Sequence, residues 1–301
     1  MYSNVFEIKN DTGIYTLRTY QVFPGIQLIY HDAHIQSVSL EIDEIISDSI
    51  LEINHCREGR VESNVNGEYW YLAAGDLSIS CLNSISTPYF PLRHYHGITI
   101  RVDLMQTPKS LSKLLEDVVV SPQEIMDRFC LETGGAIFRS NASIEHIFSE
   151  LYSVPEEIQK GYFKVKILEL FLFLSVMKIN QEDTKKHHLS SSQVFLAKEI
   201  SNYLIENMNN RITLDELTNK FHVSATQIKN IFKTVFGVSP YAFIRTRKME
   251  SAAYMLEYTD KSILEIAGEH GYDNGSKFAS AFRDVKGVLP TEYRSLYSKK
   301  D

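Results

Sequence analysis

The chain has 301 residues, enough for two domains, and its 44% hydrophobic and 23% charged residues exclude collagenous, fibrous and broadly disordered proteins. The net charge of −7 does not exclude a nucleic-acid binder, because 16 basic and 25 acidic residues precede Ser190 whereas 15 basic and 13 acidic residues lie from Ser190 onward. The longest strongly apolar run, at 170–177, has eight residues and cannot cross a bilayer, and residues 1–20 lack the organisation of a signal peptide. Three cysteines without CxxC spacing argue against a disulfide framework or a structural zinc site and favour the cytoplasm.

Residues 14–103 predict a β-rich region, because short β-type runs alternate with turn residues. Asn66-Gly67 is a strong signal for a two-residue hairpin, and Ala74-Gly75-Asp76 marks the next turn. Many short strands at this spacing predict an antiparallel barrel or sandwich. The predicted strands lie at 14–22, 25–30, 51–55, 60–65, 68–72, 77–81 and 97–103.

The pattern changes to a helical period between residues 110 and 179, and the best helix is predicted at 162–179. Its apolar residues lie on more than one face, so the helix needs two partners. One partner is its own β-rich region. The second is either the same helix of another subunit, in a homodimer, or further burial within the chain. Residues 181–192 are polar and predict a linker between domains at 1–180 and 193–301.

Beyond the linker the sequence repeats itself at an offset of 50 residues, as between Phe232 and Phe282. We therefore expect one structural unit to occur twice. The other matched pairs are Leu214 and Leu264, Asp215 and Glu265, Ile228 and Phe278, Lys233 and Arg283, Val235 and Val285, Gly237 and Gly287, Val238 and Val288, and Pro240 and Pro290.

The first unit is predicted to be a helix, a tight turn and a second helix. Thr213 and Glu216 form a predicted capping box ahead of a short amphipathic helix. The turn at 222–224 ends in Ser224, a good N-cap for the second helix, which Gly237 then closes. The residues expected to face inward are Ile228, Ile231, Phe232 and Val235.

The second unit repeats this order. A capping box at Ser262 and Glu265 starts its first helix, a turn follows at 272–274, and the second helix begins at about Gly275. Ser239-Pro240 starts the helix that joins the two units, and its seventeen residues would span about 25 Å as a rigid spacer. The second helix is expected to bury Phe278, Ala281, Phe282 and Val285.

Two such helices fit successive major grooves on one face of a DNA duplex, which lie roughly 34 Å apart. The alternative, that both units are plain αα-hairpins of a helical bundle, is disfavoured by the duplication. Thr226, Lys229 and Asn230 suit base reading, whereas lysine and arginine nearby hold phosphates. The predicted DNA-binding residues are Thr226, Gln227, Lys229, Asn230 and Lys233 in the first unit and Ser276, Lys277, Ser280 and Arg283 in the second.

Residues 214–294 resemble the AraC/XylS family of bacterial transcription regulators. The resemblance lies in Ile266-Ala267-x-x-x-Gly271-Tyr272, then Phe282-Arg283, Gly287 and the segment Pro290-Thr291-Glu292-Tyr293-Arg294. It implies that the second helix of each unit enters the major groove of promoter DNA. Its reading positions correspond to Thr226, Lys229 and Asn230, and then to Gly275, Ser276 and Ser280. Because the second set lacks the long Gln or Arg common in the family, we expect that helix to make mainly phosphate and shape contacts.

The resemblance further implies an α+β protein whose N-terminal half is a cupin-like antiparallel β-barrel with helices. This half would bind a small-molecule effector and form a homodimer through the helix at 162–179. We expect a DNA-binding transcription regulator that is not an enzyme and needs no cofactor, with RNA polymerase as a further partner if it is an activator. The alternative from another class is a cupin-type metal enzyme with an appended DNA-binding domain.

Candidate sites in the N-terminal half are less defined. His94-x-His96 matches two ligands of a cupin metal site, but residues 97–103 lack the expected glutamate, so we predict no metal; His187-His188 is expected to be solvated. Cys56 beside Arg57 fits either a reactive thiolate or a half-buried strand residue. Aromatic residues with polar tips suit an effector pocket, with barrel core or surface pairs as the alternative. These candidates are Tyr30, Tyr69, Trp70, Tyr71 and Tyr95.

Overall fold

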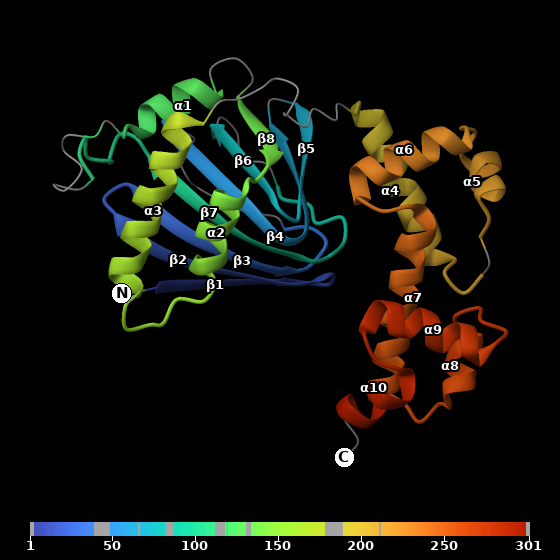
Figure 1. Cartoon of the computed structure of the whole chain (residues 1–301). Coiled ribbons are helices and arrows are strands. Elements are labelled where there is room, and N and C mark those ends of the chain that lie inside the picture. Colours follow the sequence, from blue (N-terminus) through green and yellow to red (C-terminus); the bar gives the residue numbers. More distant parts are fainter. Residues whose placement is uncertain are drawn as a thin grey trace. The chain divides into compact units, whose positions relative to one another are not determined.

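The computed structural model describes residues 3–38, 49–65, 67–81, 87–111, 118, 120–130, 134–177, 189–210 and 212–298. The chain divides into two compact units, Met1–His188 and Leu189–Asp301 (Figure 1). Residues 181–188 of the expected linker lie outside the described residues. Ser191 and Ser192, at its other end, already belong to the first helix of the second unit.

One antiparallel sheet forms the frame of the N-terminal unit. Its strands lie in the spatial order β1-β2-β3-β7-β4-β6-β8, and β5 pairs with β4 outside this path. In the part of the chain that the structure describes, β1 pairs only with β2 and β8 only with β6, so the sheet is open. The strands are β1 (Ser3–Asn10), β2 (Gly13–Phe23), β3 (Ile26–His34), β4 (Ile50–Val65), β5 (Glu68–Ala73), β6 (Asp76–Cys81), β7 (Tyr95–Asp103) and β8 (Gly135–Arg139).

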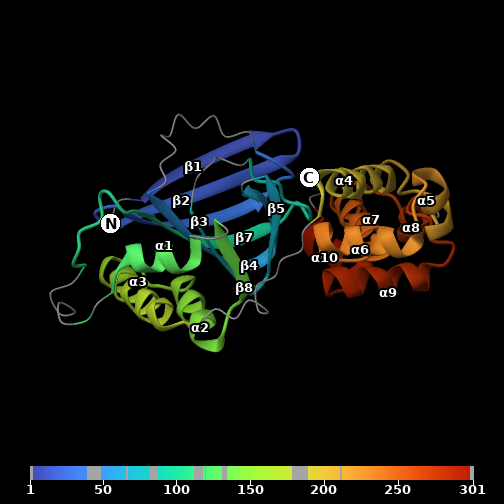
Figure 2. The ribbon, with the colours of Figure 1, turned by 90° about the horizontal axis from the view of Figure 1, so that it is seen from above.

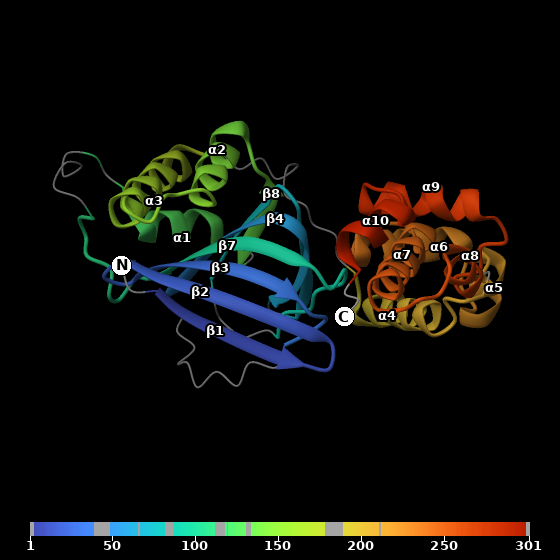
Figure 3. The ribbon, with the colours of Figure 1, turned by 90° about the horizontal axis from the view of Figure 1, so that it is seen from below.

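The expected barrel is therefore wrong, because a barrel closes only when its last strand pairs with its first. Here β1 and β8 lie at opposite ends of the strand order. After β8 the chain forms the helices α2 (Ala142–Leu151) and α3 (Gln159–Val176). With α1 (Pro122–Cys130), these helices cover one face of the sheet, as Figures 2 and 3 show. The unit combines sheet and helices, as the predicted α+β class requires.

The hairpin predicted at Asn66-Gly67 is confirmed, because Val65 of β4 pairs with Glu68 of β5. Gly67 has a φ of 84°, a left-handed conformation that glycine adopts without strain. The 16-residue strand β4 is divided by an irregularity between Cys56 and Glu58. Up to Gly59 it pairs with β7, and over its first part also with β6, whereas from Arg60 onward it pairs with β5.

Two apolar clusters lie on opposite faces of the sheet. The larger lies against the helices and includes Ile53 and Ile100 of the strands with Phe148, Phe163 and Leu170 of α2 and α3. Since side chains alternate along a strand, the neighbouring positions face the other way and build the smaller cluster. Its members include Ala33, Cys56, Val61, Leu72, Phe90 and Tyr95.

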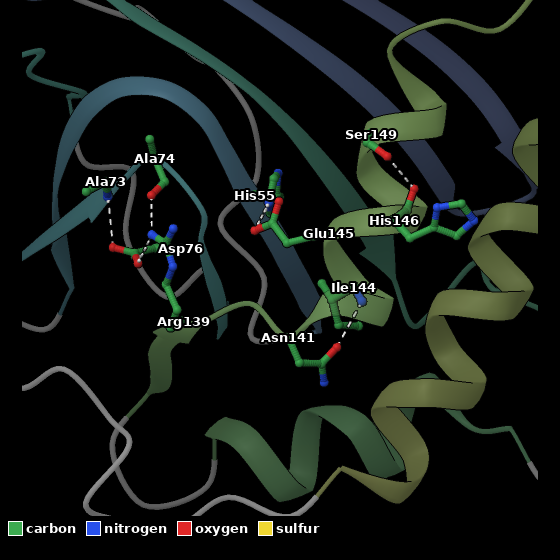
Figure 4. Close-up of polar contacts among 10 residues, drawn as sticks. All are labelled: His55, Ala73, Ala74, Asp76, Arg139, Asn141, Ile144, Glu145, His146 and Ser149. Carbon is green, nitrogen blue, oxygen red and sulfur yellow. Dashed lines mark hydrogen bonds and ion pairs between the residues drawn. The ribbon is translucent and has the colours of Figure 1, made fainter.

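Polar contacts fasten α2 to the sheet (Figure 4). Asn141 caps the helix, and its side chain accepts a hydrogen bond from Ile144 N over 3.0 Å. Glu145 Oε1 lies 3.1 Å from Nε2 of the buried His55 on β4, whose ring stacks on Phe148. Burial lowers the pKa of His55, so the neutral ring donates to Glu145. Helix α2 therefore meets β4 through one hydrogen bond and one ring stack.

A second group in Figure 4 joins the turn after β5 to the end of β8. The buried Asp76 accepts a hydrogen bond from Ala73 N over 3.1 Å and pairs with Arg139 at 3.5 Å. Arg139 also donates to the carbonyl of Ala74. These contacts fix the chain just before it enters α2.

The C-terminal unit is helical. Figure 1 shows α4–α6 at one end of the long helix α7 and α8–α10 at the other. Its core includes the rings of Phe232, Phe236 and Phe243 at the first end and Met249, Phe278 and Phe282 at the second. The helices are α4 (Ser191–Glu206), α5 (Leu214–Phe221), α6 (Ala225–Phe236), α7 (Pro240–Tyr258), α8 (Ile263–Glu269), α9 (Gly275–Lys286) and α10 (Pro290–Tyr297).

Candidate nucleic-acid interface

Helix α6 has one apolar and one polar face, because its side chains follow the helical period. Ser224 caps the helix by accepting a hydrogen bond from Gln227 N over 3.2 Å, and Gly237 ends it with a φ of 77°. The buried residues are Ile228, Ile231, Phe232, Val235 and Phe236. The five predicted DNA-binding residues are all exposed, namely Thr226, Gln227, Lys229, Asn230 and Lys233.

The turn ahead of α6 is short and holds His222 in the left-handed region, with a φ of 54°. Such a conformation is uncommon outside glycine, although His, Asn and Asp adopt it more readily than bulkier residues. At the start of α5, Thr213 accepts a hydrogen bond from Glu216 N, as predicted. The Glu216 carboxylate accepts from Tyr203 of α4 at 2.9 Å, so among the described groups the predicted capping box is only half formed.

Helix α9 has the same kinds of cap, terminal glycine and buried face as α6. Asn274 caps it by accepting a hydrogen bond from Ser276 N over 2.8 Å, and Gly287 ends it with a φ of 80°. The capping box predicted at Ser262 and Glu265 of α8 is fully formed. Of the four residues expected to be buried, Phe278, Ala281 and Phe282 are buried and Val285 is half-buried. The predicted DNA-binding residues Ser276, Lys277, Ser280 and Arg283 are all exposed.

Gly275, the first residue of α9, lies against α8. A Cβ atom at this position would be 3.0 Å from Leu264 Cδ2, which is tighter than an ordinary van der Waals contact. A side chain at position 275 would therefore require the exposed Leu264 side chain to move by a few tenths of an ångström.

The basic side chains of the unit differ in their partners. Some are paired within the protein, as Arg247 with Glu250 at 2.8 Å and Lys261 with Glu269 at 2.7 Å. Four exposed basic side chains of α6 and α9 form no ion pair with any residue that the structure describes, namely Lys229, Lys233, Lys277 and Arg283. Their charges are thus available to an external anion, and they lie on the outer faces of α6 and α9.

Comparison with known proteins supports this interpretation of the C-terminal unit. The family model described as a helix-turn-helix domain matches residues 217–295. The uncharacterized HTH-type transcriptional regulator YdiP of Escherichia coli K12 is 35% identical over 102 residues, which are 34% of this chain and 34% of YdiP. The TetD protein of transposon Tn10, from Escherichia coli, is 32% identical over 97 residues, which are 32% of this chain and 70% of TetD.

The chain belongs to the AraC/XylS family of transcription regulators. A solved structure of a probable AraC family transcriptional regulator from Rhodopseudomonas palustris CGA009 is 25% identical, with a TM-score of 0.32, and covers 35% of this chain and 98% of that chain. The match spans about a third of the length of YdiP, 34%. The helix-turn-helix model matches residues 217–295, in the C-terminal unit, so the N-terminal unit must be interpreted from its own residues.

In this AraC/XylS family member, the five aromatic residues predicted to bind an effector do not form one group. Tyr30 lies on the helix-covered face of the sheet, where its hydroxyl donates to the carbonyl of Leu151 over 2.6 Å. Tyr95 lies on the opposite face and donates to Asn54 Oδ1 over 2.7 Å. Strand alternation separates them, a feature that their positions in the sequence did not reveal.

The other three aromatic residues are neighbours on β5. Trp70 packs against the same cluster as Tyr95. Tyr71 is buried, and its hydroxyl donates to Glu62 Oε2 over 2.8 Å. Tyr69 is half-buried. Of the predicted set, only Trp70 and Tyr95 therefore share one apolar cluster.

Polar side chains that the sequence did not single out lie near Tyr95. His31 contacts the Tyr15 hydroxyl at 2.6 Å and Thr99 Oγ1 at 2.8 Å, and its ring lies 6.0 Å from that of Tyr95. Burial lowers the pKa of His31 to about 3, so the ring is neutral. These residues come from β2, β3 and β7, which the antiparallel pairing brings together. The sequence did not single out these residues because it does not show which strand positions pair.

The remaining candidates also find definite places. Burial raises the pKa of the Cys56 thiol, which contradicts a reactive thiolate. His94 and His96 lie beside His34, a residue that the sequence pattern did not connect with them.

Over the described residues, no helix has both the length and the apolar character needed to span a membrane.

Proposed function

We propose that the protein is a cytoplasmic, sequence-specific DNA-binding transcription regulator in which α6 is the principal reading helix. The carrying observation is the outer face of α6, where five polar side chains are exposed above a fully apolar inner face. Lys229 and Lys233 form no ion pair with any described residue. A helix with this surface offers hydrogen bonds to base edges and positive charge to phosphates.

Both helix pairs, α5–α6 and α8–α9, act as helix-turn-helix units in this proposal. Helix α7 has 19 residues, a length of about 28 Å at 1.5 Å per residue. This is close to the roughly 34 Å between successive major grooves on one face of DNA. We assign base contacts to Thr226, Lys229 and Asn230, and phosphate contacts to Lys233, Lys277 and Arg283. Gln227, Ser276 and Ser280 would make the shorter contacts beside them.

We further propose that residues 1–180 bind a small effector and form a homodimer, with 181–192 as the linker. An effector suits the face of the sheet that carries Tyr95 and His31, because neutral hydrogen-bonding groups and aromatic rings recognise small polar molecules. RNA polymerase would be a partner if the regulator activates transcription. We propose no catalytic residue.

The dimer proposal rests on helix α3. Val165, Phe173 and Val176 are 60%, 39% and 73% exposed, although other apolar residues of the same helix are fully buried. A second copy of α3 would cover these side chains. Replacing Val165 and Val176 together by aspartate should therefore shift the full chain towards monomer in analytical ultracentrifugation. An unchanged association constant would remove α3 from the interface.

The DNA function is tested by selecting duplexes from a random double-stranded library with the full chain. We expect one enriched sequence that binds the protein at least about 1,000-fold more tightly than a scrambled duplex of the same length. No enrichment, with equal affinity for both duplexes, would contradict the proposal. The variant carrying Thr226→Ala and Asn230→Ala is the matched control, because it should lose the preference while both exposed substitutions leave the fold intact.

A further inference from the structure

Three histidines from separate segments meet at the rim of the sheet. His34 ends β3, His96 is the second residue of β7, and His94 directly precedes that strand. The ring centroids lie 4.6 Å apart for His94 and His96, 5.2 Å for His34 and His94, and 5.3 Å for His34 and His96. One ring nitrogen of each lies within 4.8 Å of the others.

Two carboxylates complete this cluster. Asp32 Oδ1 lies 3.0 Å from His34 Nε2 and 2.9 Å from His96 Nε2. Glu58 Oε2 lies 3.5 Å from His94 Nε2 and 3.7 Å from His96 Nδ1. The pairing explains the arrangement, because Asp32 of β3 and Glu58 of β4 both stand opposite His96 of the central strand.

We propose that the imidazoles of His34, His94 and His96 bind one divalent transition-metal ion of the zinc type, with Asp32 and Glu58 beside the rings as partners that orient them. Imidazole nitrogen and carboxylate oxygen are the donors that Zn²⁺ and Co²⁺ prefer outside thiolate sites. Ligand atoms around a tetrahedral zinc ion lie about 3.3 Å apart, given bonds of about 2.05 Å. Small rotations of these rings would bring their nitrogens to that distance.

Exposure and charge favour an ion at this position. His34 is 59% exposed and His96 29%, so an ion can enter from solvent and keep a water ligand. Arg57 Nε lies 3.4 Å from Glu58 Oε1, and the negative charge of the two carboxylates exceeds the positive charge of this guanidinium.

The site is separate from the surface proposed for an effector. His96 alternates in register with Ile98 and Ile100 of the helix-covered cluster, whereas Tyr95 faces the other side of the sheet. A bound ion would link β3, β4 and β7 at one point. Metal binding here is also independent of the proposed DNA recognition, which lies in the other unit.

The test is a calorimetric titration of the full chain, free of any affinity tag, with ZnCl₂. We expect one ion per chain, and a loss of at least about 100-fold in affinity when His34→Ala and His96→Ala are combined. The matched control combines His187→Ala and His188→Ala, which removes two histidines elsewhere and should leave the affinity unchanged. Unchanged binding by the first variant, or its loss in the control, would overturn the site.

Three further measurements test the proposal even if the double variant is suspected of misfolding. Without metal, the melting temperatures of the wild type and the His34/His96 variant should agree, and excess Zn²⁺ should raise only that of the wild type and the control. Asp32→Asn, which preserves shape, should weaken binding about 10-fold. With Co²⁺, the wild type should show visible absorption of a nitrogen- and oxygen-ligated ion; a spectrum identical in the His34/His96 variant contradicts the assignment.

Discussion

Helices α6 and α9 are alike in their caps and buried positions but differ in their outward side chains. Both have 12 residues, begin at a side-chain cap and end at a glycine in the left-handed region. Their outward positions diverge, because Gln227, Lys229 and Asn230 of α6 correspond to Lys277, Ala279 and Ser280 of α9. The apolar positions maintain each helix pair, and the outward positions are free to change. The two pairs need not contribute equally to DNA recognition.

Because the two helices have the same buried positions, equivalent core substitutions should lower the free energy of unfolding equally. Phe232 and Phe282 are both fully buried, so Phe232→Ala and Phe282→Ala should each lower the free energy of unfolding by about 3 to 5 kcal/mol. Denaturant unfolding followed by far-UV circular dichroism measures both. Thr226→Ala and Ser276→Ala are matched surface controls and should change stability by less than about 0.5 kcal/mol. If one phenylalanine variant were as stable as its control, the two helix pairs would not contribute equally to stability.

The different surfaces predict unequal effects on base reading. Asn230→Ala or Lys229→Ala should weaken binding to the selected duplex by about 1 to 3 kcal/mol, whereas Ser280→Ala should cost less than about 0.5 kcal/mol. Fluorescence anisotropy with the selected and a scrambled duplex measures both. Equal losses on the two duplexes would show that Asn230 does not read bases. A larger loss for Ser280→Ala would reverse the proposed ranking.

The helix pairs also differ in a titratable group. His270, which ends α8, is buried, and its Nδ1 donates to the carbonyl of Ile266 over 2.8 Å. Burial lowers its pKa, so the unfolded state binds more protons and stability falls as the pH drops below about 6.5, by at most about 1.4 kcal/mol per pH unit. His270→Gln should flatten this slope in unfolding experiments between pH 7 and 5. A slope for His270→Gln equal to that of the wild type would show that His270 does not contribute to the pH dependence.

The smallest expected effects concern phosphate contacts, for which the pairs should behave alike. Lys233→Ala and Arg283→Ala occupy corresponding positions and should each reduce the slope of log affinity against log salt by about 0.9. Both should weaken binding to selected and scrambled duplexes equally. Lys261→Ala, which removes a lysine paired with Glu269, should leave the slope unchanged. A normal slope for Arg283→Ala alone would indicate that α9 lies away from the backbone.

The C-terminal unit was predictable because its information is local. Caps such as Ser224 and Ser262, and the terminal Gly237, act on residues within one or two turns. The sheet depends on pairing between distant segments, which short β-type runs do not encode. The helices after Arg139 follow from the helical period at 110–179, but the sequence does not show that β1 and β8 lie at opposite ends of the strand order, so it predicts a barrel.

The candidate sites differ in the same way, because a site on one helix depends on local signals whereas a site on the sheet depends on strand pairing. The outward residues of α6 follow from a single helical period, and all five are exposed. Tyr30 and Tyr95 required knowledge of which face each strand position takes. His34 joins His96 only through the pairing of β3 with β7, in which Asp32 stands opposite His96. A search for ligands at short spacing finds His94 and His96 but cannot find the third histidine.

The contact between position 275 and Leu264 has a consequence for anyone redesigning operator preference. A side chain installed at position 275 would require Leu264 Cδ2 to move by a few tenths of an ångström, and the Leu264 side chain is 71% exposed, so it has room to rotate. Shortening Leu264 in the same variant would remove this contact. Retargeting the second helix pair at position 275 thus involves two neighbouring positions, whereas the exposed Asn230 can be varied singly.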